Sequence, residues 1–172
     1  YRDEGYLADA MVNYLMTLGW TPPGAEEAGT EIATWDEMEA AFRLEDVTHS
    51  PAFFDLKKLA AFNGDYIRMM SADEFLAATD AELPPEWDRE RFAAIAPHIQ
   101  QRLVTLKDVP GTVDFLFLPD GADLDFDDKS WAKAMKPEWA GPLLADVIEA
   151  YSDESLVWEA DAVKSALESI ME

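Results

Sequence analysis

The sequence predicts an all-α protein, and three observations support this fold class. Apolar residues recur at helical spacing in most segments, helix-capping residues precede several of these segments, and no series of alternating apolar and polar residues appears. The chain has 172 residues, of which 49% are hydrophobic. This is enough apolar surface for a core in one domain or in two small ones.

The first predicted helix covers residues 5–18. Leu7, Met11 and Leu18 recur there at helical spacing, and Gly19 stands where a C-terminal cap is expected. A break at residues 21–24 follows, because two prolines and a glycine there oppose any regular element.

Two pairs of residues have the spacing of a capping box, in which a hydroxyl and a carboxylate bond to each other's backbone amides. Thr34 and Glu37 predict a short helix after the first loop, and Ser71 and Glu74 predict another. Both pairs precede apolar residues, as a helix start requires.

The central predicted helix begins after Asp55, whose carboxylate can accept from the free amides of a first turn. One face of this helix carries Leu56, Leu59, Asn63 and Ile67. A buried amide needs hydrogen-bond partners, so we expect Asn63 to connect two segments. Gly64 is expected to end or bend the helix.

The prolines of Leu83-Pro84-Pro85 predict a domain boundary, which divides the chain into residues 1–82 and residues 83–172. Asp88 is expected to cap a long helix that Pro97 kinks or splits in two.

The rest of the chain predicts further helical structure. Thr105 and Asp108 form a capping-box variant, and the apolar run at residues 113–118 fits a strand or a buried helix. The last three predicted helices cover residues 130–135, 139–151 and 156–171.

Composition limits the possible functions. The chain has no cysteine, which excludes disulfides, zinc–thiolate sites and thiol catalysis, and it has no apolar run long enough to span a membrane. These features predict a cytoplasmic protein. A formal net charge of −23 argues against a nucleic-acid partner. However, seven of the thirteen cations lie between residues 57 and 107, so one basic face is possible.

No stretch has the pattern of a catalytic or metal site. The acidic loop from Asp120 to Asp128 fails the EF-hand pattern, because an aspartate replaces the required glycine and an alanine replaces the last carboxylate. His49 and His98 lack the spacing of metal ligands. We therefore expect neither a catalytic residue nor a metal ligand. Arg102 stands out because a guanidinium at a helix end can present a planar set of donors to a base edge.

Three stretches together resemble the C-terminal part of bacterial glutamyl-tRNA synthetase, a class I aminoacyl-tRNA synthetase. The first is YRDEGYLADAMVNYLMTLGW at positions 1–20. The second runs from Ser50-Pro51 through Asn63 to Tyr66-Ile67, and the third runs from Arg102 to Phe117. Order and spacing match over roughly the first 118 residues.

The resemblance implies a helical region that contacts the tRNA stem at residues 1–82. It also implies a helical anticodon-binding domain at residues 83–172, incomplete at its C-terminal end. By this resemblance Arg102 reads the third anticodon base and separates glutamate tRNA from glutamine tRNA. The other cations expected to contact tRNA are Lys57, Lys58, Arg68 and Lys107. Asp55 and Asn63 are expected to have structural roles.

By the same resemblance, the chain is a tRNA-recognition fragment of a ligase that attaches glutamate to its tRNA in protein synthesis. The HIGH and KMSKS-type motifs are absent, so the fragment itself is expected to be non-catalytic and to hold no cofactor. ATP and magnesium would belong to the catalytic domain of the full-length enzyme. A monomer that binds glutamate tRNA is expected. The alternative is a stand-alone acidic helical module that contacts proteins and no longer binds RNA.

Overall fold

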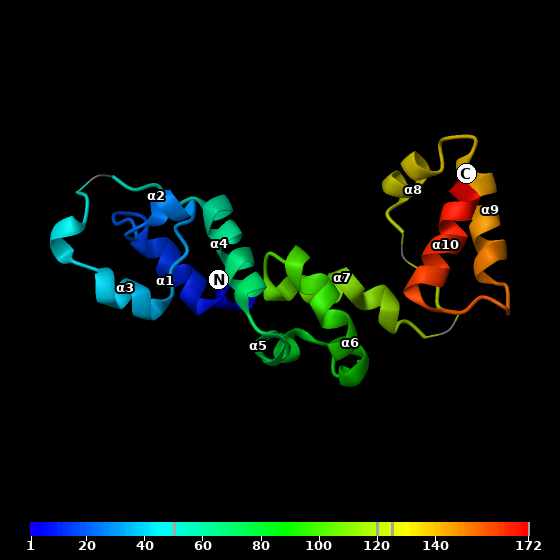
Figure 1. Ribbon diagram of the computed structural model, residues 1–172, viewed down its shortest axis with the longest axis horizontal. Helices are drawn as coiled ribbons and strands as arrows, with labels where there is room; N and C mark the ends of the chain where they lie inside the picture. Colours follow the sequence, from blue (N-terminus) through cyan, green and yellow to red (C-terminus); the bar gives the residue numbers. More distant parts are fainter. Residues whose placement is uncertain (50, 120, 125, 172) are drawn as a thin grey trace. The chain divides into compact units, whose positions relative to one another are not determined.

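A computed structural model describes residues 1–49, 51–119, 121–124 and 126–171 of the chain (Figure 1). Every regular element in these ranges is a helix, which confirms the predicted fold class. The chain forms two compact units, Tyr1–Asp120 and Gly121–Glu172. Ser50, Asp120 and Asp125, the last two from the acidic loop named above, lie outside the described ranges.

The first unit contains seven α-helices and six short 3-10 turns within the described residues. The α-helices are α1 (Ala8–Met16), α2 (Ala25–Ala28), α3 (Trp35–Ala41), α4 (Leu56–Met69), α5 (Ala72–Thr79), α6 (Arg89–Ile99) and α7 (Val109–Val113). The 3-10 turns are η1 (Arg2–Glu4), η2 (Leu44–Asp46), η3 (Asp80–Glu82), η4 (Gln100–Arg102), η5 (Leu106–Asp108) and η6 (Asp114–Phe117). Helix α1 packs along α4, and this pair lies between α3 and the helices α5 to α7 (Figure 1).

The core of the first unit consists of three apolar clusters. One joins α1 to α4 through Tyr14, Leu59 and Phe62. A second surrounds Trp20 and Met38 beside α3. The largest cluster joins the end of α4 to α5, α6 and α7, and its buried members are Ile67, Phe75, Leu83, Phe92, Ala96, Ile99, Leu103, Leu106, Val109 and Val113.

The largest cluster crosses the predicted boundary between residues 82 and 83, because Leu83 is one of its buried members. The compact units instead separate between residues 120 and 121. The division into residues 1–82 and 83–172 therefore stays a prediction about function, and it marks no break in apolar packing.

The helix starts of the first unit follow the predicted capping residues. Thr34 and Glu37 form a complete capping box at the start of α3, and Ser71 and Glu74 form one at the start of α5. Hydrogen bonds from the Thr34 backbone and hydroxyl lower the pKa of the Glu37 carboxyl. Asp88 accepts from the amides of Glu90 and Arg91 at the start of α6.

The prediction for the first helix was wrong at both ends. Helix α1 covers Ala8–Met16, and Thr17 stands at its C-terminal cap. Gly19 has no left-handed backbone conformation, so it is not the expected cap. A side chain at Gly19 would lie 3.3 Å from a methyl carbon of Val47, so the glycine allows the chain to approach closely there.

Two predicted helix interruptions are absent, an end at Gly64 and a split at Pro97, whereas the bend and the kink predicted as alternatives stay predictions. Helix α4 continues through Gly64 to Met69. Helix α6 contains Pro97 and is not split; it ends two residues later, at Ile99, where η4 begins. Pro97 lies in the last turn of α6. It removes one backbone hydrogen bond there and does not divide the helix.

The apolar run at residues 113–118 is helical, because η6 continues directly from α7. Within this run, Phe117 stacks on Trp87 with a ring-centroid distance of 4.1 Å and an interplanar angle of 5°. The guanidinium carbon of Arg91 lies 5.5 Å from the centre of the Phe117 ring. These contacts hold η6 against the start of α6.

The second unit contains α8 (Asp128–Ala134), α9 (Ala140–Tyr151) and α10 (Ala160–Met171). Helices α9 and α10 pack on each other, and Tyr151 contacts Trp158 at the connection between them. Ala140 is the buried apolar residue here, whereas Trp139 and Trp158 are largely exposed.

Candidate nucleic-acid interface

Asn63 connects three segments of the first unit. Its side-chain oxygen accepts from the backbone amide of Leu7 over 2.7 Å. Its side-chain nitrogen donates to the carbonyl oxygens of Val104 (2.7 Å) and Gly5 (3.4 Å). Asn63 is fully buried, so these bonds replace the water that its amide loses on folding.

The turn at Gly5 packs directly on residues 106 and 107. Gly5 has a left-handed backbone (φ 77°), and a side chain there would lie 2.5 Å from the backbone nitrogen of Lys107. The amide of Leu106 donates to the Gly5 carbonyl over 3.0 Å. The first turn of the chain, α4 and residues 103–107 therefore form one junction around Asn63.

Gln100 fixes the adjoining 3-10 turn, η4, against the end of α4. Its side-chain nitrogen donates to the carbonyl oxygens of Ile67 and Met70, each over 2.8 Å. These carbonyls lie at the C-terminus of α4, where Met70 is the cap and the Ile67 carbonyl also accepts from the Met70 amide over 3.3 Å. Gln100 is 7% exposed, and it lies two residues before Arg102.

Arg102 is the last residue of η4, and its side chain is exposed. Within the described residues it has no hydrogen-bond or ion-pair partner of its own. Its backbone is nevertheless fixed on both sides, by buried Gln100 and by buried Leu103. The turn thus presents a guanidinium with free donors from a rigid position.

A second group of residues lies along one face of α4. Lys57, Ala61, Gly64 and Arg68 recur at helical spacing, so they share a face. Lys57 and Arg68 are about 16 Å apart along the axis, at 1.5 Å per residue. Ala61 adds little bulk between these cations.

Gly64 and Arg68 place this face beside residues 102–107. A side chain at Gly64 would lie 3.1 Å from Nη1 of Arg68 and 3.3 Å from the carbonyl oxygen of Leu103. The Arg68 guanidinium therefore occupies the space that the glycine leaves, next to the residue that follows Arg102. Helix α4 and the η4 turn therefore pack against each other, with Gly64 and Leu103 buried where they meet.

Three of the five cations predicted to contact tRNA form ion pairs with carboxylates. Lys58 pairs with Glu31 over 2.5 Å and Lys107 with Glu4 over 3.3 Å. Arg68 pairs with Asp65 over 2.5 Å. The other two, Lys57 and Arg102, have no such partner among the described residues.

Asp55 begins α4 as an N-cap, since one of its carboxylate oxygens accepts from the amides of Lys57 (2.8 Å) and Lys58 (3.3 Å). The amide of Asp55 donates to the Tyr14 hydroxyl over 2.6 Å, which connects this end of α4 to α1. Leu56, which was expected on the buried face, is 54% exposed instead. It lies in the first turn of the helix, outside the contact with α1.

A polar network that no sequence pattern indicated fixes the loop before α3. The Tyr66 hydroxyl donates to the carbonyl of Ala33 over 2.7 Å. The Asn13 side chain accepts from the Ala33 amide over 3.0 Å and donates to the carbonyl of Glu31 over 3.1 Å. Burial, followed by the charges of Asp9 and Glu37, raises the pKa of Tyr66 to about 12.

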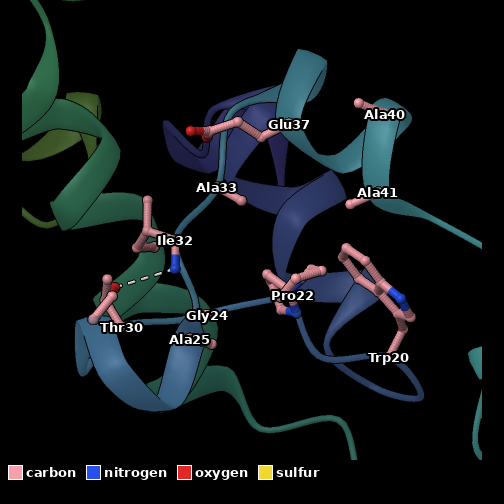
Figure 2. Close-up of a pocket in the computed structure, with 12 residues that line it drawn as sticks. Trp20, Pro22, Gly24, Ala25, Thr30, Ile32, Ala33, Glu37, Ala40 and Ala41 are labelled. Carbon is pink, nitrogen blue, oxygen red and sulfur yellow. Dashed lines mark hydrogen bonds between the residues drawn. The ribbon is translucent and has the colours of Figure 1, made fainter.

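The same loop borders a pocket of about 440 Å³ (Figure 2). Figure 2 shows Trp20 and Pro22 on one side and Ala40 and Ala41 of α3 on another. The carboxylate of Glu37 is used by its capping box, so the pocket offers alanines, prolines and one indole ring. These side chains supply no charged or catalytic group to a ligand.

Among the described residues, no three His, Asp or Glu side chains are grouped so that they could hold a metal ion. No helix in those ranges is long and apolar enough to cross a membrane.

Comparison with known proteins gives consistent matches. The family model of the anticodon binding domain matches residues 67–172. A glutamate–tRNA ligase of Frankia casuarinae is 48% identical over 180 residues, covering 100% of this chain and 36% of that protein. One of Salinispora tropica is 49% identical over 182 residues, covering 99% of this chain and 37% of that protein.

A solved structure agrees with these sequence matches. The crystal structure of a glutamate tRNA ligase from Elizabethkingia meningosepticum superimposes with a TM-score of 0.76 at 29% identity, covering 99% of this chain and 32% of that one. The chain thus spans about a third of the length of the relatives that it matches. It belongs to the glutamate–tRNA ligase family and contains the family's anticodon-binding domain.

Proposed function

We propose that the chain is the tRNA-recognition part of a glutamate–tRNA ligase. The observation that carries this is the surface of two adjoining elements, α4 and η4, which carry Lys57, Arg68 and Arg102. Asn63 and Gln100 fix the two parts of this surface to each other. Cations held on fixed elements suit the phosphates of an RNA backbone.

In this proposal the cations have different roles. Lys57, Lys58, Arg68 and Lys107 contact phosphates, which position the RNA without reading its sequence. Arg102 bonds to the third anticodon base, because its free guanidinium donors match the acceptors of an unpaired cytosine. Residues 1–82 then serve the tRNA stem, and residues 83–172 serve the anticodon.

The proposal extends to the whole enzyme. Glutamate activation with ATP and magnesium would take place in the remaining two-thirds of the ligase, and this chain would hold neither cofactor. The chain would act as a monomer in the cytoplasm and bind glutamate tRNA. This division fits the share of its relatives that the chain covers.

Fluorescence anisotropy with labelled glutamate tRNA tests the proposal. The chain is expected to bind at low salt, with affinity that falls as salt rises. Lys57→Ala and Arg68→Ala should each weaken binding several-fold and reduce the salt slope by about 0.7–0.9. Lys164→Ala in α10 is the control, because Lys164 lies in the second unit and pairs with Glu168.

The net charge of −23 favours one other function, a protein-interaction module that binds no RNA. The same titration distinguishes the two. Absence of binding to glutamate tRNA at low salt, by a chain with a cooperative thermal melt, would overturn the proposed function in favour of the interaction module.

A further inference from the structure

Three carboxylates form ion pairs with cations that are proposed to contact RNA phosphates. Glu31, Asp65 and Glu4 pair with Lys58, Arg68 and Lys107, respectively. All six side chains are at least one-third exposed, and exposed ion pairs of this kind add little to stability. Their positions therefore need an explanation other than folding.

The Asp65–Arg68 pair holds a guanidinium in a folded-back position. Both residues lie on α4, and the Arg68 guanidinium lies over Gly64. A glycine inside a 14-residue helix costs about 1 kcal/mol relative to alanine. Here the glycine leaves room for the guanidinium beside its carboxylate. Arg68 is thus held along the helix, with about a third of its side chain exposed.

Glu31 is positioned by its backbone as well as by its ion pair. Its carbonyl accepts from the buried Asn13 side chain over 3.1 Å, and the next segment is held by Tyr66 through the Ala33 carbonyl. These bonds fix the loop that carries the carboxylate. Glu31 would stay near Lys58 even when the ion pair opened.

Glu4 is positioned in the same way. It is the last residue of η1, directly before the Gly5 turn that packs on the backbone of Lys107. The Leu106 amide donates to the Gly5 carbonyl over 3.0 Å. The turn therefore keeps the backbones of Glu4 and Lys107 close together, within reach of the ion pair between their side chains.

We propose that Glu4, Glu31 and Asp65 are built-in competitors of RNA phosphate, an inference that rests on the proposed function. A carboxylate fixed beside a cation has a high effective concentration, so a phosphate must displace it in order to bind. The competitors lower affinity for every RNA. Selectivity then depends on RNA that also reaches the unpaired side chains, Lys57 and Arg102.

The test compares two triple variants of the 172-residue chain with equal net charge. The first removes the competitors through Glu4→Gln, Glu31→Gln and Asp65→Asn. The control carries Glu39→Gln, Glu86→Gln and Asp46→Asn. Those three carboxylates are exposed and have no ion-pair partner among the described residues. Both variants are titrated with glutamate tRNA and with an unrelated tRNA over a range of salt.

The competitor-free variant should bind both tRNAs about tenfold more tightly than the unchanged chain. Its salt slope should stay close to that of the unchanged chain, since the same cations contact phosphate once the carboxylates are displaced. The ratio of the two affinities should fall. The control variant should gain less than about threefold in affinity, at an unchanged slope, because distant exposed charges are screened.

Equal gains by the two triple variants would overturn the inference, because net charge alone would then explain them. If the competitor-free triple variant has a lower melting temperature than the control variant, the single variant Asp65→Asn is titrated instead. It should tighten binding two- to threefold, and an unchanged affinity would overturn the role of Asp65. Failure of every form, including the unchanged chain, to bind tRNA at low salt would instead overturn the proposed function itself.

Discussion

The side chain of Asn63 donates to the carbonyl oxygen of Val104 over 2.7 Å, and this bond spans 41 residues of sequence. It joins the middle of α4 to the residues that follow Arg102. Because the same amide also accepts from Leu7, one buried side chain sets the position of three segments that the proposed interface needs.

Replacing Asn63 with alanine should therefore destabilise the first unit. The change leaves the Leu7 amide and the Val104 carbonyl without their partner, and each unpaired buried group costs about 1–3 kcal/mol. We expect a lower midpoint in urea unfolding. Asn63→Asp should lose at least as much at neutral pH, because a buried carboxylate oxygen would face the carbonyl oxygens of Val104 and Gly5. An unfolding curve unchanged by Asn63→Ala would contradict this role.

The hydrogen bonds of Gln100 predict that this residue stabilises the end of α4, and the adjacent Gln101 provides a control. Gln100→Ala removes the side-chain donor to the carbonyls of Ile67 and Met70, of which only Ile67 keeps a backbone donor, and should cost about 1–2 kcal/mol of stability. Hydrogen exchange should speed up at the end of α4 and in η4. Gln101→Ala is the control, because Gln101 is exposed and should change neither measurement. Equal effects of the two changes would argue against the contact.

Replacing Gly64 or Gly111 with alanine should change the stability of the chain in different ways. Gly111 lies in α7 with open space around its missing side chain, so Gly111→Ala should stabilise by about 0.5–1 kcal/mol through helix propensity. Gly64→Ala should gain less or lose stability, since the new methyl group meets the Arg68 guanidinium and the backbone oxygen of Leu103. Chemical denaturation of the two variants measures this, and equal gains would show that the space at Gly64 is unoccupied.

The Tyr66 hydroxyl predicts a pH dependence above pH 10. Its pKa is raised from 10.0 to about 12 in the folded chain, chiefly by burial, so the folded state holds the phenol proton more tightly. The contribution is complete below pH 10 and is lost as the pH rises toward 12. Stability should fall over this range, and Tyr66→Phe should fall less steeply. Parallel pH curves for the two proteins would contradict the assignment.

Much of the first unit could be predicted from local sequence. The capping boxes at Thr34 and Ser71 depend on side chains three residues away, so their spacing alone identifies them. The same holds for the N-cap at Asp88. The burial of Leu59 and Ile67 follows from helical spacing, and both are fully buried.

The interface geometry could not be predicted in the same way, because its partners are distant in sequence. A lone amide on an apolar face indicates that Asn63 needs hydrogen-bond partners. It does not identify Gly5 and Val104 as those partners. Gln100 resembles any polar residue at a helix end. The role of Gly64 depends on the guanidinium of Arg68, which folds back over the glycine. Sequence alone does not show this contact, so a glycine at this position predicted an end or a bend, whereas the helix continues.

The most direct measurement of the central claim is the preference of the chain for one anticodon base. The chain is titrated with the anticodon stem-loop of glutamate tRNA and with the same loop carrying guanine in place of the third anticodon cytosine. We predict roughly tenfold tighter binding to the first loop, a preference that Arg102→Gln removes and that Lys107→Gln, the loss of a phosphate contact, leaves intact. Equal binding of the two loops by the unchanged chain, or a preference that survives Arg102→Gln, would contradict the account.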